Sequence, residues 1–264
     1  MDREAWETQV VTRPLPNAVR YDLSAPDQVQ ITLPPRSLWS SGLHWHETHV
    51  EYLRVVQGRV RVRLGGLEKI VRAAGGGSEP APPPEIRIDK NVWHEWSRAD
   101  AGEDDDGEDD EDAVVVERTV PADGEKSVFF WNLNGVLLEA QRGVATRRAP
   151  VALLPAPLRS WVSDAWVTLS LFVIFAHLDN VPVLLDALGL ASRVGWTPGW
   201  DSPPGRLLRR VDGLCSHVVL GAAAVLGWAL GIRAVRLELT PDGALRRWTS
   251  HRASHKASHK ERSA

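Results

Sequence analysis

The feature that most constrains this chain is a period-two alternation of apolar and polar residues in its first half. Val60, Val62 and Leu64 alternate with arginines, as in a strand that buries one face and exposes the other. Gly, Pro and acidic residues separate several such runs, so the sequence predicts a mainly β fold, either a closed barrel or a jelly-roll sandwich. The other predicted strands contain residues 29–33, 53–55, 86–88, 92–96, 114–120 and 128–130.

Two glycine-containing turns flank the strand rich in arginine. Gln57-Gly58 separates the runs at 53–55 and 60–64, so these two runs are predicted to form a hairpin. Gly65-Gly66 is predicted to end the second run.

Potential metal ligands lie in and around these strands. His44 and His46 are two residues apart, so on a strand their side chains share one face and can reach one ion. Glu51 follows after a short bend, and His94 lies one hairpin later. Three imidazoles and one carboxylate form a ligand set that divalent first-row metals accept. Trp96 is predicted to share the inward face with His94 and to line the pocket.

The run from His44 to Glu51, with Gly58 after it, reads H-x-H-x4-E-x6-G. It resembles the first motif of the cupin superfamily, and in particular the type-2 conserved-barrel domain. The resemblance covers about residues 25–135. It implies a double-stranded β-helix, or jelly-roll, barrel that binds a divalent ion of iron, manganese, nickel or zinc through the four predicted ligands. Softness of the ligands alone does not choose among these metals.

The second cupin motif is matched only in part. Asp89 stands where the family has Pro, Asn91 stands where it has Gly, and His94 supplies the last imidazole. Asn is among the few residues other than Gly that tolerate a left-handed turn, so the exchange at position 91 is mild. Arg98 occupies the position at which the family often has Asn.

The resemblance also suggests a function. Cupins include dioxygenases, isomerases, decarboxylases and non-catalytic sugar-binding proteins, so the fold alone selects no reaction. The His-Trp-His-Glu-Thr-His sequence and the apolar C-terminal region resemble small fungal cupin-domain oxidoreductases. This implies a metal-dependent, dioxygenase-like oxidoreductase of secondary metabolism that acts on a small organic molecule. Two alternatives stay open: a metal-assisted isomerase or lyase, and a non-catalytic, membrane-tethered module that binds a ligand.

Composition narrows the class of protein further. The formal net charge of −3 gives no general attraction to nucleic acid, and we expect no nucleic-acid partner. Cys215 is the single cysteine, which fits a reducing compartment. The first residues lack the apolar region of a secretory signal, so the protein is expected to be cytoplasmic or membrane-associated and not secreted. A homodimer paired through barrel edges is compatible with the resemblance.

The sequence divides into four regions. An N-terminal arm covers residues 1–24, and the barrel domain covers 25–149 with disordered insertions near 73–84 and 101–112. A helical, apolar region covers 150–235, and a basic, disordered tail covers 236–264.

The apolar region bears on whether the protein associates with a membrane. Residues 213–232 contain no Asp, Glu, Lys or Arg and match the thickness of a bilayer's hydrocarbon core. This segment is predicted to be either a core helix packed under the barrel or a C-terminal transmembrane helix, and membrane association through it is expected. Residues 166–176 are too short to span and fit a buried or interfacial helix.

Overall fold

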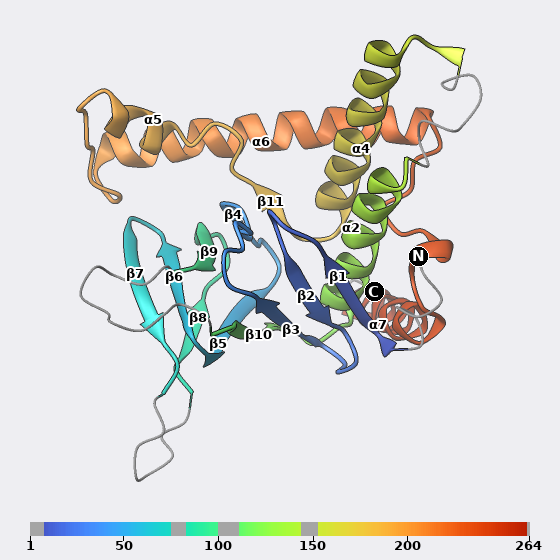
Figure 1. The fold of residues 1–264 in the computed structure, drawn as a ribbon, viewed down its shortest axis with the longest axis horizontal. Coiled ribbons are helices and arrows are strands. Elements are labelled where there is room, and N and C mark those ends of the chain that lie inside the picture. Colours follow the sequence, from blue (N-terminus) through green and yellow to red (C-terminus); the bar gives the residue numbers. More distant parts are fainter. Residues whose placement is uncertain (1–7, 75–82, 100–110, 144–152, 263–264) are drawn as a thin grey trace.

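The computed structural model describes residues 8–74, 83–99, 111–143 and 153–262 (Figure 1). The strands are β1 (Val10–Arg13), β2 (Val19–Asp22), β3 (Gln28–Leu33), β4 (His44–Trp45), β5 (Val50–Gln57), β6 (Arg59–Leu64), β7 (Leu67–Arg72), β8 (Glu85–Ile88), β9 (His94–Arg98), β10 (Ala113–Val120) and β11 (Val181–Pro182). The helices are α2 (Glu125–Gln141), α4 (Ala156–His177), α5 (Ala187–Arg193), α6 (Pro203–Ala229) and α7 (Asp242–Arg262), with a short 3-10 turn, η2 (Leu237–Leu239).

The strands form two antiparallel sheets, ordered β1-β2-β3-β10-β5-β8 and β11-β4-β9-β6-β7. Ile31 and Leu53 of the first sheet and Val62 and Trp96 of the second belong to one buried core. Among the described strands no hydrogen-bonded ladder joins the sheets. Of the two predicted arrangements, the structure therefore has the sandwich.

Gly58 is a corner between the sheets, and the predicted hairpin between 53–55 and 60–64 is wrong. β5 pairs with β10 and β8, whereas β6 pairs with β7 and β9. Gly58 has a φ of 68°, and a Cβ there would lie 2.7 Å from the carbonyl oxygen of Asp112. Only glycine fits such a corner. The hairpin is instead β6–β7, in which Leu64 pairs with Leu67 across Gly65-Gly66.

Two other segments differ from the sequence-based expectation. Residues 128–130, predicted as a strand, lie in α2. Every residue from 126 to 132 is buried, so the helix has no polar face there and lacks the 3.6-residue period that would reveal it. The predicted N-terminal arm contains β1 and β2, which extend the first sheet because β2 pairs with β3.

The tail, predicted to be disordered, contains α7 from residue 242 to 262. Its first turns are held by tertiary contacts: Trp248 Nε1 lies 3.5 Å from Glu125 Oε2, and an Arg247 guanidinium nitrogen lies 3.3 Å from Asp27 Oδ2. The predicted disordered insertions near 73–84 and 101–112 lie mostly outside the described residues.

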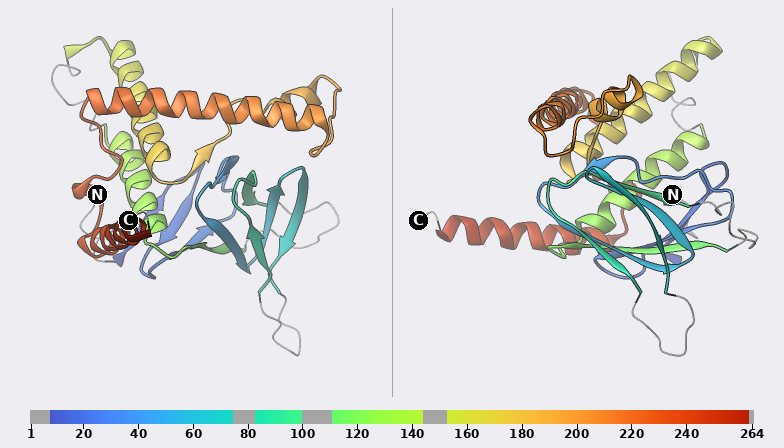
Figure 2. Two further views of the ribbon diagram at one scale, coloured as in Figure 1. Left: turned by 180° about the vertical axis from the view of Figure 1, so that it is seen from behind. Right: turned by 90° about the vertical axis from the view of Figure 1, so that its left-hand side faces the viewer.

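The helical region forms a layer over one end of the sandwich. α6 runs across the top in Figure 1, α5 lies at one end of it, and α4 crosses the other end beside α2. The views in Figure 2 show the same separation of layers. β11 joins the layers because Val181 pairs with Trp45 of β4. Both α4 and α6 are long and apolar enough to cross a membrane, by length and composition only.

Candidate metal centre

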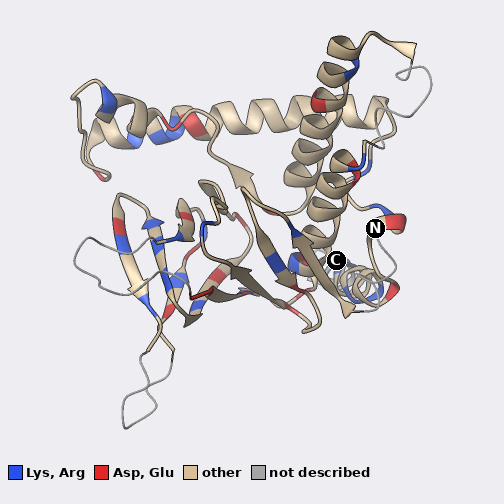
Figure 3. Cartoon of the chain, viewed as in Figure 1, with Lys and Arg blue, Asp and Glu red and all other residues tan. Residues whose placement is uncertain are grey.

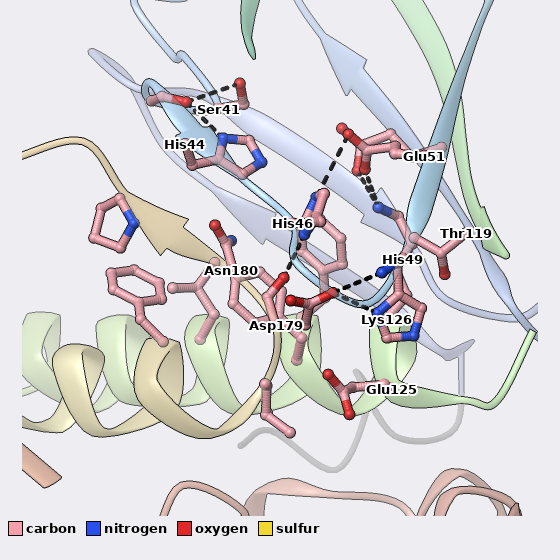
Figure 4. Close-up of a pocket in the computed structure, with 18 of the residues that line it drawn as sticks. Ser41, His44, His46, His49, Glu51, Thr119, Glu125, Lys126, Asp179 and Asn180 are labelled. Carbon is pink, nitrogen blue, oxygen red and sulfur yellow. Dashed lines mark hydrogen bonds and ion pairs between the residues drawn. The ribbon is translucent and has the colours of Figure 1, made fainter. Parts of the chain in front are cut away.

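The structure brings the four predicted ligands together. His44 on β4 pairs directly with His94 on β9, which places their rings 4.1 Å apart. Glu51 comes from β5 in the other sheet, and His46 follows the end of β4 (Figure 4). All four side chains are buried, and one ligand atom of each lies within 4.8 Å of the others.

Backbone carbonyls orient the three imidazole rings. His44 Nδ1 donates to the carbonyl of Gly42 at 2.7 Å, and His94 Nδ1 donates to that of Val92 at 3.0 Å. His46 Nδ1 donates to the carbonyl of Asp179. With a proton on Nδ1, each neutral ring presents its Nε2 lone pair for a ligand, which is how second-shell groups hold metal-binding histidines.

The inward-facing nitrogens fit a bound cation. His46 Nε2 and His94 Nε2 are buried without a hydrogen-bond partner of acceptable geometry. His94 Nε2 nevertheless lies 2.8 Å from Glu51 Oε2, and His46 Nε2 lies 3.7 Å from it. Two lone pairs so close repel unless a positive charge lies between them. Two ligand atoms that each lie about 2.1 Å from one ion are at most about 4.2 Å apart. The four ligand atoms here lie within 4.8 Å of one another, so the largest separation must shorten by no more than about 0.6 Å for all four to bind one ion.

The pKa values in the cluster follow from burial and from Glu51. Burial lowers the pKa of His44 well below its ordinary value, so this imidazole is neutral and available as a ligand. Burial alone would lower the pKa of His46, but the carboxylate of Glu51 outweighs it and raises that pKa. A proton therefore competes with an ion for His46, which makes the affinity for the ion dependent on pH. The buried His-His-Glu-His group could bind a metal ion.

Lys126, which the sequence did not indicate, orients the carboxylate ligand. Its ammonium contacts Glu51 Oε1 and lies 2.9 Å from Glu117 Oε2, while Trp96 Nε1 donates to the other oxygen of Glu117 at 2.7 Å. Burial alone would raise the pKa of Glu51, but Lys126, together with the histidines, holds it well below its usual range. Glu51 thus stays ionised and keeps Oε2 free for the metal.

The sequence also did not indicate a role for Asp179, whose carboxylate holds the loop after His46 in place. Its carboxylate accepts hydrogen bonds from the backbone amides of Glu47, Thr48 and His49, at 2.7, 3.0 and 2.9 Å. His49 Nδ1 donates to Asp179 Oδ2 at 2.6 Å, and its Nε2 donates to Asp123 Oδ2 at 3.2 Å. Asp179 lies between α4 and β11, so the helical layer contributes directly to the order of the metal site.

A cavity of about 330 Å³ adjoins the cluster. Its polar end is formed by His44, His46 and Glu51. Its remaining wall is largely apolar and comes largely from α2; it includes Phe129, Phe130, Leu133 and Leu137 of that helix, Phe175 of α4 and Leu178, which follows α4. The cavity is large enough for a small organic molecule.

The tryptophans near the site lie in two places. Trp96, predicted to line the pocket, packs behind the cavity wall with its ring 4.8 Å from that of Trp39, which does line it. Trp45 and Trp93, each next to a ligand along the chain, point away from the ligands. Their rings stack 5.8 Å apart in a separate cluster with Val181 and Leu220.

No protein-family model matches this chain, and no curated protein sequence is detectably similar to it. Among solved structures, the capsular polysaccharide assembling protein CapF from Staphylococcus aureus is 18% identical with a TM-score of 0.30, and the match covers 42% of this chain and 30% of CapF. A predicted oxalate decarboxylase from Thermotoga maritima is 15% identical with a TM-score of 0.29, over 39% of this chain and 79% of that one. The CENP-C cupin domain of Drosophila melanogaster is 12% identical with a TM-score of 0.29, over 42% and 75%. Similarities this low carry no argument about function.

Proposed function

We propose that this protein is a metal-dependent oxidoreductase of the cupin type that acts on a small, largely apolar organic molecule, in keeping with a role in secondary metabolism. The observation that carries the proposal is the convergence of three buried imidazole nitrogens and one ionised carboxylate at the end of an apolar cavity. His44, His46, Glu51 and His94 would hold the ion. When bound, it would supply a Lewis acid and, if iron or manganese, a redox centre.

The remaining residues of the site bind and orient. Lys126 keeps Glu51 ionised and aims one oxygen at the histidines. Phe129, Leu133 and Phe175 would exclude water from the substrate and contact its apolar body. A substrate with one oxygen-containing group and an apolar remainder matches this division of the cavity into a polar and an apolar end.

Elemental analysis of the purified protein tests the first part of the proposal. We expect close to one equivalent of iron, manganese, nickel or zinc per chain in the wild type. The variants His46→Ala and His94→Ala should lose it, because each removes one of four ligands. His251→Ala is a matched control because His251 is exposed on α7. Full metal content in both site variants would contradict the proposal.

Nitric oxide, used as a substitute for dioxygen, tests the redox part without a known substrate. Protein loaded anaerobically with Fe(II) should give the EPR signal of a high-spin iron nitrosyl if an open position faces the cavity. Protein loaded with Zn(II) serves as the blank. Stoichiometric iron without a nitrosyl signal would remove the support for oxygen chemistry.

A metal-assisted isomerase or lyase is the second candidate. It is favoured by the same ligand set, since a Lewis acid alone serves such reactions. Substrate turnover that continues without oxygen and with Zn(II) in place of iron would select it over the oxidoreductase.

A further inference from the structure

An apolar stripe runs along α6 on the side that faces away from the sandwich. The side chains of Leu214, Val218, Val225 and Trp228 are 67%, 61%, 69% and 82% exposed. They recur at intervals of three, four and seven residues, together with Leu207 and Val211, so they lie on one face of the helix. We call these six residues the outer face of α6.

The opposite side of α6 is unusually polar for an inward face. Asp212 and Ser216 are fully buried there. Asp212 Oδ2 accepts the amide of Ala187 at 2.9 Å, and Ser216 Oγ donates to the carbonyl of Pro182 at 2.7 Å. A surface helix of a water-soluble protein buries its apolar side and exposes its polar side. α6 exposes its apolar outer face while it buries Asp212 and Ser216 together with Leu220 and Ala223, which indicates that the outer face meets an apolar medium or partner.

Neighbouring segments add apolar and aromatic surface of the same kind. Trp161 near the start of α4 is 67% exposed, and Val194 and Trp196 after α5 are 81% and 51% exposed. Tryptophan is enriched where proteins meet the boundary between lipid and water. Exposed apolar side chains of the helical layer are thus not confined to α6.

Basic residues bracket the outer face. Arg206 and Arg210 are exposed near the start of α6, and Arg233 is exposed just beyond its end. Within the described part of the chain, none of the three forms an ion pair with a carboxylate. Figure 3 shows basic residues on α6 near α5 and an uncharged stretch along the rest of the helix. Arginines at both ends of an apolar stripe are complementary to anionic lipid headgroups.

We propose that the outer face of α6 docks on an anionic membrane, with the helix parallel to the bilayer surface. A second copy of the chain fits less well, because an antiparallel pair would bring the bracketing arginines of both copies together. A spanning helix fits less well too, since insertion would break the hydrogen bonds of Asp212 and Ser216 and place a carboxylate in hydrocarbon. Docking in this way leaves the sandwich and its cavity outside the bilayer.

Flotation of the full chain with lipid vesicles tests the proposal. We expect the wild type to float with vesicles of phosphatidylcholine and phosphatidylserine, and more weakly with phosphatidylcholine alone. The variant Leu214→Glu/Val218→Glu/Val225→Glu should bind about tenfold less or worse, because three apolar contacts become charged. Ile70→Glu is the matched control: Ile70 is 52% exposed within β7, further along the strand from the Gly65-Gly66 turn that packs on Trp200.

A second variant keeps the test valid if the triple variant does not fold. Arg206→Gln/Arg210→Gln should lose about fivefold of the preference for phosphatidylserine per charge removed. Thermal unfolding confirms that each variant is folded. Three results would overturn the proposal: wild type that stays with the vesicle-free fraction, wild type that resists extraction by alkaline carbonate as a spanning protein does, or a dimer in light scattering that only the triple variant abolishes.

Discussion

Lys126 and Glu51 form a buried ion pair that joins α2 to β5 and leaves the second carboxylate oxygen of Glu51 2.8 Å from His94 Nε2. The pair therefore links the stability of the fold to the geometry of the metal site. Lys126 also lies 2.9 Å from Glu117, so one ammonium compensates two buried carboxylates.

Replacement of Lys126 by Met should destabilise the protein by about 3–5 kcal/mol, because it leaves Glu51 and Glu117 buried without a positive partner. Urea unfolding in the presence of a chelator measures the loss. The double variant Lys126→Met/Glu117→Gln should recover part of it, since one of the two unpaired charges is removed. A loss below about 1 kcal/mol in the single variant would show that the pair is not desolvated.

Asp179→Ala should weaken metal binding by about 10–100-fold, although Asp179 is no ligand. Its carboxylate holds the amides of Glu47, Thr48 and His49, and without it the loop that carries His46 loses its anchor. Competition with a chromogenic chelator measures the affinity. Asp123→Ala, which removes the contact with His49 Nε2 and the acceptor for the Glu125 amide but leaves the amides of residues 47–49 bound to Asp179, should have a smaller effect. Equal effects of the two variants would assign the role to His49 instead.

His49 should make stability depend on pH above neutrality. Burial alone would lower its pKa, but Asp123 and Asp179 raise it to about 9 from its ordinary value of 6.5. The folded state therefore keeps a proton that the unfolded state loses between these values. The stabilisation is complete below about pH 6.5 and is lost as the pH rises through about 9, with a slope of at most about 1.4 kcal/mol per pH unit. Urea unfolding of the wild type and His49→Gln in chelator should show this slope only in the wild type.

Gly227→Ala should loosen the contact between α4 and α6. A Cβ at Gly227 would lie 2.4 Å from Val173 Cγ2, so the helices must separate at a cost of about 1–3 kcal/mol. Gly221→Ala is the control, because a Cβ there meets nothing within 4 Å and alanine favours the helix by up to about 1 kcal/mol. Thermal unfolding compares the two, and destabilisation by Gly221→Ala alone would refute this packing.

Some elements could be predicted because their signals are local. The alternation of Val60, Val62 and Leu64 identified β6, and Asn91 was correctly expected to tolerate a left-handed turn, with a φ of 61°. The proximity of His44 and His46 could be predicted for the same reason, because their two-residue spacing is a property of the chain itself. Glu51 and His94 join them through the packing of β5 and the pairing of β9 with β4.

Other features of the site could not be predicted from the sequence, because the residues that contact each other are far apart along the chain. Lys126 reaches Glu51 across 75 positions, and Asp179 reaches His49 across 130. Neither residue stands in a motif, and α2, being enclosed, carries no helical period that would place Lys126 correctly.

The sequence by itself determined the strands with one buried face, the identity of the four potential ligands and the presence of one long apolar segment at 213–232, because these depend on residue type and short spacing. Only the tertiary structure decided that β5 and β6 belong to different sheets, that Lys126 and Asp179 hold the site in place, and that α6 turns its apolar side outward. Those outcomes depend on which surfaces meet when the layers pack, and that choice is made by contacts between segments far apart along the chain.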